Sequence, residues 1–504
     1  MEVLIQGFRF FITEPATLPL LVFGVLFGII FGCIPGLTAT LGIVLLIPFT
    51  YVMAAELGLA LLIGIYVGGI SGGLITAILL NIPGTPSSMV TCWDGYPMAS
   101  KRGLPGQALS IGVFSSALGG SFSALALIFI APPLSKIALS FGSWEYLAIM
   151  VLGMSVVVMM TSDNPLKGLI AALIGIGIGA IGIDVISGVS RLTFGFWQLQ
   201  AGMNVVAISM AFFAVREIFT QVRDFGKSDP VMKKGDVKDK IPIFPPLEAL
   251  KGTSIAFILG SIYGTIIGML PGVGQTTAGM LAYNSSRQFS KHPEKYGTGI
   301  SEGIVASETA NNAVNGGALI PLLTLGIPGD MVTAVLIGGL MIQGIKPGPL
   351  LFRDNPGVVG TIMVAYLLSN IIMFILELGF MRIFVKISKA PLSILFPIIL
   401  ITCVLGVYAL NNRVFDLWIL AIFGIIGYLL TEVNVPMPPL ILGYVLGQMI
   451  ERTFRTAMYA SYGDIKDIFN RPVAIAILLL AVFLTLMPYI SIIKNRFFGK
   501  KAIS

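Results

Sequence analysis

The sequence predicts an all-α polytopic membrane protein, and its composition and its long uncharged runs carry that prediction. Hydrophobic residues make up 56% of the 504 residues and charged residues only 11%, whereas a soluble domain carries about 25% charged residues. Leu57–Trp93 and Gly252–Ser286 contain no Asp, Glu, Lys, Arg or His. About 20 apolar residues span a bilayer, so runs of this length exclude a soluble protein.

The apolar segments divide into full crossings and shorter pieces. The candidates fall at roughly 17–34, 38–54, 57–81, 106–132, 144–160, 166–187, 203–218, 250–269, 273–286, 303–326, 331–345, 355–380, 390–410, 415–431, 435–450 and 472–493. Three of them, 38–54, 273–286 and 331–345, are short and read as half-helices or hairpin arms. About ten to twelve transmembrane helices remain by the length rule.

A charged, proline-containing segment at 222–246 separates two halves of comparable length. It is net basic, and basic loops favour the cytoplasmic side of a membrane. We therefore predict a first membrane half at 1–221, a cytoplasmic basic linker at 222–246, and a second membrane half with C-terminal helices at 247–504.

The two halves share a pair of Pro-Gly breaks in the same order, which predicts an internal repeat. The first half reads "GIIFGCIPGLTATLG" and then "SGGLITAILLNIPGTP". The second half reads "GTIIGMLPGVGQTTAGM" and then "NGGALIPLLTLGIPGD". One Pro-Gly would be a simple kink, but four in two matched pairs indicate a functional site.

Broken helices are costly in lipid, which is why the four breaks point to function. Proline removes a backbone donor, and unsatisfied backbone groups survive in a membrane only where protein or a water-filled cavity receives them. Paired breaks at matching positions are typical of a transporter's central site. The residues after each Pro-Gly are natural helix starts, and no Lys or Arg lies in these stretches. An anion would therefore be held by helix N-termini.

Hydroxyl, amide and glycine residues around the breaks are the candidate ligands. The predicted substrate-binding residues are Pro35, Gly36, Thr38, Thr40, Asn81, Pro83, Gly84, Thr85, Ser87, Pro271, Gly272, Gln275, Thr276, Asn312, Pro328 and Gly329. The predicted coupling-ion residues are Glu308, Thr309, Asn311, Asn315 and Asp330. Their oxygens suit Na⁺, so a Na⁺ site at the breaks is a further expectation.

The carboxylates differ in the roles that we expect. Glu308 is the strongest functional candidate, because an intramembrane carboxylate is functional by default. Asp330 directly follows a break and serves either as a helix cap or as a ligand. Glu377 lies near Arg382 at a helix end, which favours an interfacial role. Asp94 sits among turn residues and is expected to shape a loop, and Asp184 either caps a helix or lines a cavity.

The long motifs resemble the large membrane subunit of the tripartite tricarboxylate transporter family. They are "GCIPGLTATLGIVLLIPFTYVM", "GGISGGLITAILLNIPGTPSS", "DGYPMASKRGLPGQAL", "GMLPGVGQTTAGML" and "ASETANNAVNGGALIPLLTLGIPGDMVTAVLIGGL". The resemblance implies a multi-pass permease of the bacterial inner membrane that imports citrate-like or related carboxylates by a Na⁺ or H⁺ gradient. It also implies two partners, a small four-helix membrane subunit and a periplasmic substrate-binding protein, beside the carboxylate substrate and the lipid bilayer.

A channel or exchanger and an enzyme are the two other function classes for such a chain. A stand-alone organic-anion channel or exchanger remains the alternative, and independence from a binding protein would distinguish it. An enzyme is not expected, because the single histidine, His292, lies in a polar stretch and no intramembrane catalytic constellation or complete Walker-type Gly-x-x-x-x-Gly-Lys-(Ser/Thr) nucleotide loop occurs. The sequence predicts no cofactor beyond a coupling ion, and no nucleic-acid partner.

Overall fold

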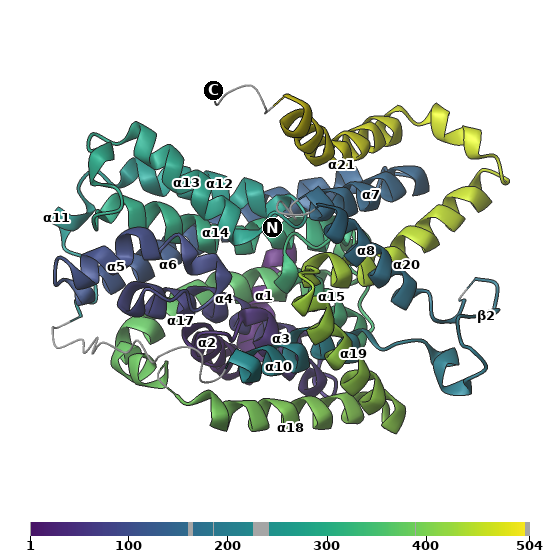
Figure 1. Ribbon diagram of the computed structural model, residues 1–504, viewed down its shortest axis with the longest axis horizontal. Helices are drawn as coiled ribbons and strands as arrows, with labels where there is room; N and C mark the ends of the chain where they lie inside the picture. The colour runs from purple at the N-terminus through teal and green to yellow at the C-terminus, as the bar shows by residue number, and fades with distance from the viewer. Residues whose placement is uncertain (1, 160–164, 185, 225–240, 389, 499–504) are drawn as a thin grey trace.

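The computed structural model describes residues 2–159, 165–184, 186–224, 241–388 and 390–498. Almost all of the regular structure there is helical (Figure 1), and β1 and β2 form a two-residue antiparallel pair with Gly182 opposite Arg191. This confirms the predicted all-α membrane fold. Most of the predicted linker 222–246 lies outside the described residues.

The helices follow the predicted segments closely. The first half contains α1 (Glu2–Thr13), α2 (Thr17–Cys33), α3 (Ala39–Thr50), α4 (Ala55–Leu80), η1 (Pro86–Met89), α5 (Cys92–Ser100), α6 (Pro105–Ala138), α7 (Ser143–Met159), α8 (Pro165–Gly179), β1 (Gly182–Ile183), β2 (Ser190–Arg191), η2 (Trp197–Ala201), α9 (Val205–Met210), the π-helical turn η3 (Ala211–Val215) and α10 (Arg216–Asp224). The second half contains α11 (Leu247–Leu250), α12 (Ser254–Met269), α13 (Gly274–Phe289), η4 (Pro293–Lys295), α14 (Ser301–Leu325), α15 (Met331–Ile342), α16 (Leu351–Asp354), α17 (Pro356–Ile387), α18 (Leu392–Asn411), α19 (Val414–Glu432), α20 (Met437–Ala460), η5 (Ile465–Asn470) and α21 (Pro472–Phe498).

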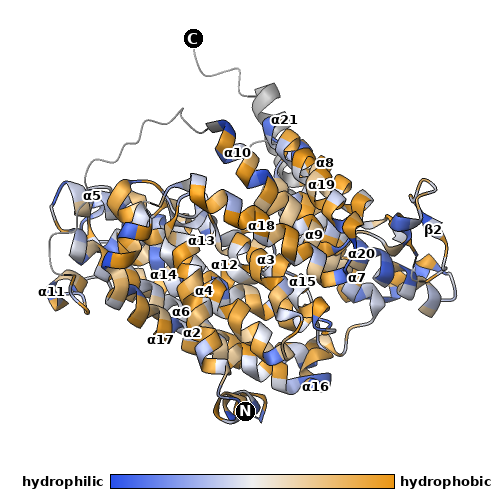
Figure 2. Ribbon diagram, turned by 90° about the horizontal axis from the view of Figure 1, so that it is seen from below, coloured by the Kyte–Doolittle hydropathy of each residue, from blue (hydrophilic) through white to orange (hydrophobic). Residues whose placement is uncertain are grey.

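The described part of the chain has six helices that are long and apolar enough to cross a membrane, or up to seven if the bent pair α1–α2 is one span. Five shorter apolar helices, among them α3, α12 and α15, accompany them. Hydrophobic residues dominate the central helices in Figure 2, while hydrophilic residues gather around β2 and on α20. The number of crossings, about ten to twelve by the length rule, stays a prediction.

Both halves contain the same order of elements around the breaks. In the first half, α2 and α3 flank one break, α4 and η1 flank the next, and the long helix α6 follows after α5. In the second half, α12 and α13, α14 and α15, and then the long helix α17 repeat this order. The two helices that precede the second breaks, α4 and α14, form the buried centre of the molecule.

Glycine ladders let the helices within each half approach closely. On α2 and α4 the glycines recur every four residues, at Gly24, Gly28, Gly32, Gly64, Gly68 and Gly72. A Cβ atom at any of them would lie 2.2–2.7 Å from a backbone oxygen of the facing helix. Small residues at this spacing allow close van der Waals packing where lipid supplies no hydrophobic drive between helices. α12 packs on α14 in the same way, through Gly264 and Gly268.

The halves interleave rather than lie side by side. α6 of the first half packs along α14 of the second, and α17 of the second half packs along α4 of the first. A Cβ atom on Gly119 of α6 would lie 2.2 Å from the carbonyl oxygen of Thr309 on α14. The buried helices α4 and α14 are therefore each covered by a long helix from the other half.

The glycines of the four breaks have two distinct structural roles. Gly36 and Gly272 have φ values of 89° and 76°, a region that favours glycine. Gly84 and Gly329 instead allow close approach, because a Cβ atom there would lie 2.4 Å from the Gly32 oxygen and 2.3 Å from the Gly268 oxygen. Gly36 and Gly272 thus share one role, and Gly84 and Gly329 share the other, at corresponding positions of the two halves.

We expect Gly329→Ala to destabilise the protein by about 1–3 kcal/mol, because the added methyl group meets backbone that cannot move away as a side chain would. Gly177→Ala in α8 is the matched control, since nothing lies within 4 Å of a Cβ atom there and alanine is the better helix former. Thermal unfolding of the two variants in the same detergent measures the difference. Equal melting temperatures would show that the close approach at Gly329 is not required.

Candidate functional site

A cavity of about 270 Å³ lies where the four breaks converge. Each break contributes to its wall, and Ile70 of α4 and three residues of α20 contribute the remaining part. The lining residues are Thr38, Ala39, Thr40, Ile70, Thr85, Pro86, Ser87, Gly272, Val273, Gly274, Gln275, Thr276, Asp330, Met331, Val332, Pro438, Pro439 and Leu442. We call this space the central cavity.

Three α-helices begin at the central cavity, one after each of three breaks. α3 follows Thr38, whose hydroxyl accepts a hydrogen bond from the Leu41 amide at 3.2 Å. α13 begins at Gly274 and α15 at Met331, and the short turn η1 begins beside them. Helix N-termini carry partial positive charge and free amide donors. Among the described residues no Lys or Arg lines the cavity and Asp330 is its one charged lining residue, so any attraction for an anion would have to come from backbone.

The half-helices of the two repeats meet at their far ends in two pairs, α3 with α15 and α5 with the loop after α13. The side chain of Gln343, just past α15, donates to the Thr50 carbonyl at the end of α3. Arg102, just past α5, donates to the Gly299 carbonyl in the loop that follows α13, at 2.5 Å. Figure 1 places α5 and α13 towards one end of the molecule and α3 and α15 nearer its middle. These contacts agree with inverted repeats, an arrangement that the sequence left open.

Asp330 caps α15 and also ties three elements together. Its Oδ1 accepts from the Thr333 amide at 2.8 Å and from the Thr333 hydroxyl at 2.7 Å. Its Oδ2 accepts from the Tyr66 hydroxyl of α4 at 2.5 Å and from the Gln275 amide of α13 at 2.6 Å. Of the two expected roles, the capping role is the one that these contacts describe. Its role as an ion ligand stays a prediction.

Eight of the predicted site residues line the central cavity, and the others lie around it. The lining ones are Thr38, Thr40, Thr85, Ser87, Gly272, Gln275, Thr276 and Asp330. Pro35, Gly36, Pro83, Gly84, Pro271, Pro328 and Gly329 belong to the breaks but not to the lining. Asn81 is exposed and ends α4 in the left-handed conformation, with φ 57°.

The remaining predicted residues lie within the buried helix α14. Glu308 is fully buried and accepts hydrogen bonds from the Thr91 hydroxyl, from the Ser116 hydroxyl at 2.9 Å and from the Asn312 amide at 3.4 Å. Several side-chain atoms nearby have no hydrogen-bond partner among the described residues. They are Thr309 Oγ1, Asn312 Oδ1 and both polar atoms of Asn311 and of Asn315.

Two expectations about carboxylates outside these sets need correction. Glu377 is not interfacial: it is fully buried in α17 and accepts a hydrogen bond from Ser71 of α4 at 2.9 Å, since α4 and α17 pack together. Asp94 does not lie in a turn but in α5, where its Oδ1 accepts from three backbone amides of residues 297–300. The carboxylate does shape a loop, though in the other half of the chain.

The contribution of α20 to the central cavity was not anticipated. Pro438, Pro439 and Leu442 close one side of it, although they lie more than a hundred residues after the last break. The run "PMPPL" at 436–440 is the signal that could have drawn attention to this helix start, because prolines cluster there as they do at the breaks.

Comparisons with known proteins agree with this architecture. Residues 18–442 match the family model described as "Tripartite tricarboxylate transporter TctA family". The "Uncharacterized 52.8 kDa protein in TAR-I ttuC' 3'region" of Agrobacterium vitis is 37% identical over 464 residues, which cover 92% of this chain and 91% of that protein.

A second protein of the same organism, the "Uncharacterized protein in TAR-II ttuC' 3'region", is 38% identical over 230 residues, 45% of this chain and 95% of its own length. No solved structure matches the chain. The family model covers most of the sequence, and the apolar helices show a multi-pass membrane protein. The chain therefore belongs to the TctA family, as the large membrane component of a tripartite tricarboxylate transporter and not an enzyme.

Proposed function

We propose that this chain is the permease that carries a small organic carboxylate across the bacterial inner membrane, driven by a Na⁺ or H⁺ gradient. Its partners in this proposal are a small four-helix membrane subunit and a periplasmic binding protein that delivers the substrate. The observation that carries the proposal is the convergence of three α-helix N-termini and four chain breaks on one cavity with no basic side chain in its wall.

The central cavity suits a small polycarboxylate such as citrate. Its volume of about 270 Å³ is close to the lower end of the range of ligand pockets. The hydroxyls of Thr40, Thr85 and Ser87 and the amide of Gln275 line it and can donate to carboxylate oxygens. Donors without full charges bind an anion less tightly than arginines would, which allows release on the other side.

The coupling ion is proposed to bind beside the central cavity, at the polar stretch of α14. Buried polar groups without protein partners are rare, and an ion or water commonly accounts for them. The Asn315 amide, which has no hydrogen-bond partner among the described residues, and the Asn311 amide beside the buried carboxylate of Glu308 supply such groups. Amide, hydroxyl and carboxylate oxygens are hard ligands that suit Na⁺, and a carboxylate can alternatively carry a proton.

Uptake into proteoliposomes tests both parts of the proposal. The vesicles would hold this chain with the small membrane subunit, and labelled citrate would be offered with and without binding protein under an inward Na⁺ or H⁺ gradient. We expect accumulation only with binding protein and with one of the two gradients. Asn315→Ala should reduce this accumulation and its dependence on the gradient.

Asn284→Ala is the matched control, because Asn284 lies exposed on α13. Normal gradient-driven uptake by Asn315→Ala would contradict the proposed ion site but not the importer. Equilibration of citrate without binding protein and without a gradient would instead favour the stand-alone channel or exchanger.

A further inference from the structure

A second cavity, of about 510 Å³, lies at the end of the molecule that carries β1 and β2 (Figure 1). The loop after α8, the start of α9, the turn between α18 and α19, and α20 form its wall. Its charged lining residues are Asp184, Arg191, Arg413, Glu451, Arg452 and Arg455. We call this space the arginine cavity. Of its charged residues only Asp184 was expected to line a cavity, as one of two roles, because the others come from separate segments of the chain.

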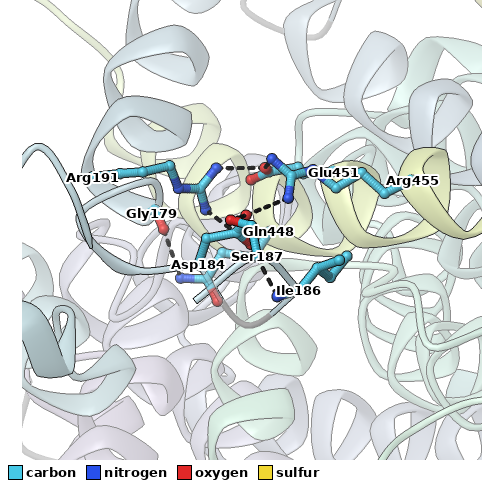
Figure 3. Close-up of polar contacts among 8 residues, drawn as sticks. All are labelled: Gly179, Asp184, Ile186, Ser187, Arg191, Gln448, Glu451 and Arg455. Atoms are coloured by element: carbon cyan, nitrogen blue, oxygen red, sulfur yellow. Dashed lines mark hydrogen bonds and ion pairs between the residues drawn. The ribbon is translucent and has the colours of Figure 1, made fainter. Parts of the chain in front are cut away.

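Four of these residues form a closed set of ion pairs (Figure 3). Arg191 contacts Glu451 at 2.5 Å and Asp184 at 3.8 Å. Arg455 pairs with Asp184 and contacts Glu451 at 3.0 Å. Hydrogen bonds from the Ser187 hydroxyl and from Arg455 hold the pKa of Asp184 well below its usual range. The carboxylate therefore stays ionised at neutral pH, and the loop that carries it stays fixed to α20.

The arginine cavity retains positive charge beyond these pairs. Four arginines and two carboxylates lie in its lining, and Arg413 also contacts the buried carboxylate of Asp416 at 3.9 Å, so an excess of one positive charge remains. The guanidinium of Arg452 makes no hydrogen bond or ion pair with any described residue, and Arg413 donates to the Gln198 carbonyl at 2.7 Å. The Nε of Arg191 is buried and has no acceptor among the described residues. Donors therefore remain for a ligand.

The position of the arginine cavity relates it to the central cavity. Met331 at the start of α15 lines the central cavity, and Met341 near its end lines the arginine cavity. Ten residues of helix separate the two, which corresponds to about 15 Å. Leu442 and Tyr444 of α20 likewise line one cavity each. The two spaces thus lie in succession along the same two helices.

The arginine cavity opens on the side opposite to the basic linker. Residues 205–223 form a candidate span, with Asn204 in the cavity wall at one end and the linker following the other end. Basic loops stay in the cytoplasm, so the arginine cavity faces the outside. At the linker end, Arg223 pairs with Glu432 at the far end of α19, which agrees with this orientation.

We propose that the arginine cavity is an outer anion site that receives the carboxylate substrate before it enters the central cavity. This inference rests on the proposed import of a carboxylate. Arg413 and Arg452 are the residues assigned to bind it, because planar guanidinium groups bind carboxylates in bidentate fashion. The volume of about 510 Å³ lies within the range of small-molecule pockets.

Citrate binding to the full chain tests the proposal. The chain would be placed in nanodiscs of phosphatidylcholine, and labelled citrate binding would be measured for wild type, Arg452→Gln, Arg413→Gln and Lys466→Gln. We expect each arginine variant to raise the Kd for citrate about tenfold or more, as loss of a charged hydrogen bond does. Lys466→Gln, outside the cavity lining, should bind as wild type does.

Uptake by the same variants separates the possible failures. A raised half-saturation concentration for both arginine variants, with the maximal rate kept, would support the outer site. Wild-type binding and uptake in both variants would overturn it and leave the importer intact. Arginine-dependent citrate binding without any accumulation would overturn the importer and leave the cavity as an anion site.

Two further results would assign the arginine cavity to another ligand and overturn the proposal. In the first, the arginine variants bind citrate with unchanged affinity but lose the uptake that depends on the binding protein. That result would indicate a docking surface for the binding protein. In the second, phosphatidylglycerol in the nanodiscs competes with citrate, the arginine variants abolish this competition, and the citrate affinity of the variants is unchanged. That result would indicate a lipid head group as the ligand.

Discussion

Glu308→Ala is expected to lower the free energy of unfolding by about 3 kcal/mol or more, because three buried donors lose their acceptor and each such loss costs about 1–3 kcal/mol. The donors are the hydroxyls of Thr91 and Ser116 and the amide of Asn312. They come from the segment before α5, from α6 and from α14, so the carboxylate joins the two interleaved halves. Thermal unfolding in detergent measures the effect.

Glu308→Gln distinguishes the structural role of this side chain from a role in ion coupling. Glutamine keeps the size and one acceptor oxygen, so we expect a smaller loss of stability than with alanine. If the negative charge takes part in coupling, the variant should fold and yet lose gradient-driven uptake in proteoliposomes. Uptake and gradient dependence equal to wild type would restrict Glu308 to the structural role.

Asp330→Ala is the second change with a large expected effect, of about 2–4 kcal/mol. Loss of a helix cap costs about 1 kcal/mol, and the buried Tyr66 hydroxyl and the Gln275 amide each lose their acceptor. Because Gln275 lines the central cavity, its release should also reduce citrate uptake. The free energy of unfolding and the citrate uptake can be measured on one preparation.

Asp354→Ala is the matched control for Asp330→Ala, since Asp354 is exposed and pairs only with its neighbour Arg353 among the described residues. Exposed pairs contribute about 0–1 kcal/mol, so this variant should unfold close to wild type. A melting temperature of Asp330→Ala that equals that of Asp354→Ala would show that the contacts of Asp330 do not stabilise the junction of α4, α13 and α15.

The helices and the breaks could be predicted from sequence because their signals are local. The apolar run at 415–431 corresponds to α19, and the prolines at 35, 83, 271 and 328 fall within the four breaks. The short helices α1 and α5 were missed, since neither contains an uncharged run of membrane length. The convergence of the breaks on one cavity followed from the repeat, which is a pattern visible in the chain itself.

What could not be predicted depends on contacts between distant segments. Glu377 looked interfacial from its neighbour Arg382, but burial against Ser71 of α4 decides its environment. The ring of Asp184, Arg191, Glu451 and Arg455 joins residues from opposite halves of the chain. The periodicity of the sequence does not predict such pairings, because nothing in the helix or loop that carries each side chain indicates its distant partner.

The interleaving of the halves has a consequence for biosynthesis. The central apolar part of α4 is buried in the finished protein, partly by α17, yet α17 begins at Pro356, long after α4 has left the ribosome. At about 5–20 residues per second, roughly 15–60 seconds pass between the two. During that interval the glycine-rich surface and the Ser71 hydroxyl of α4 lack their permanent neighbour in the bilayer. Nascent-chain quality control would therefore act on this protein mainly while its second half is still being translated.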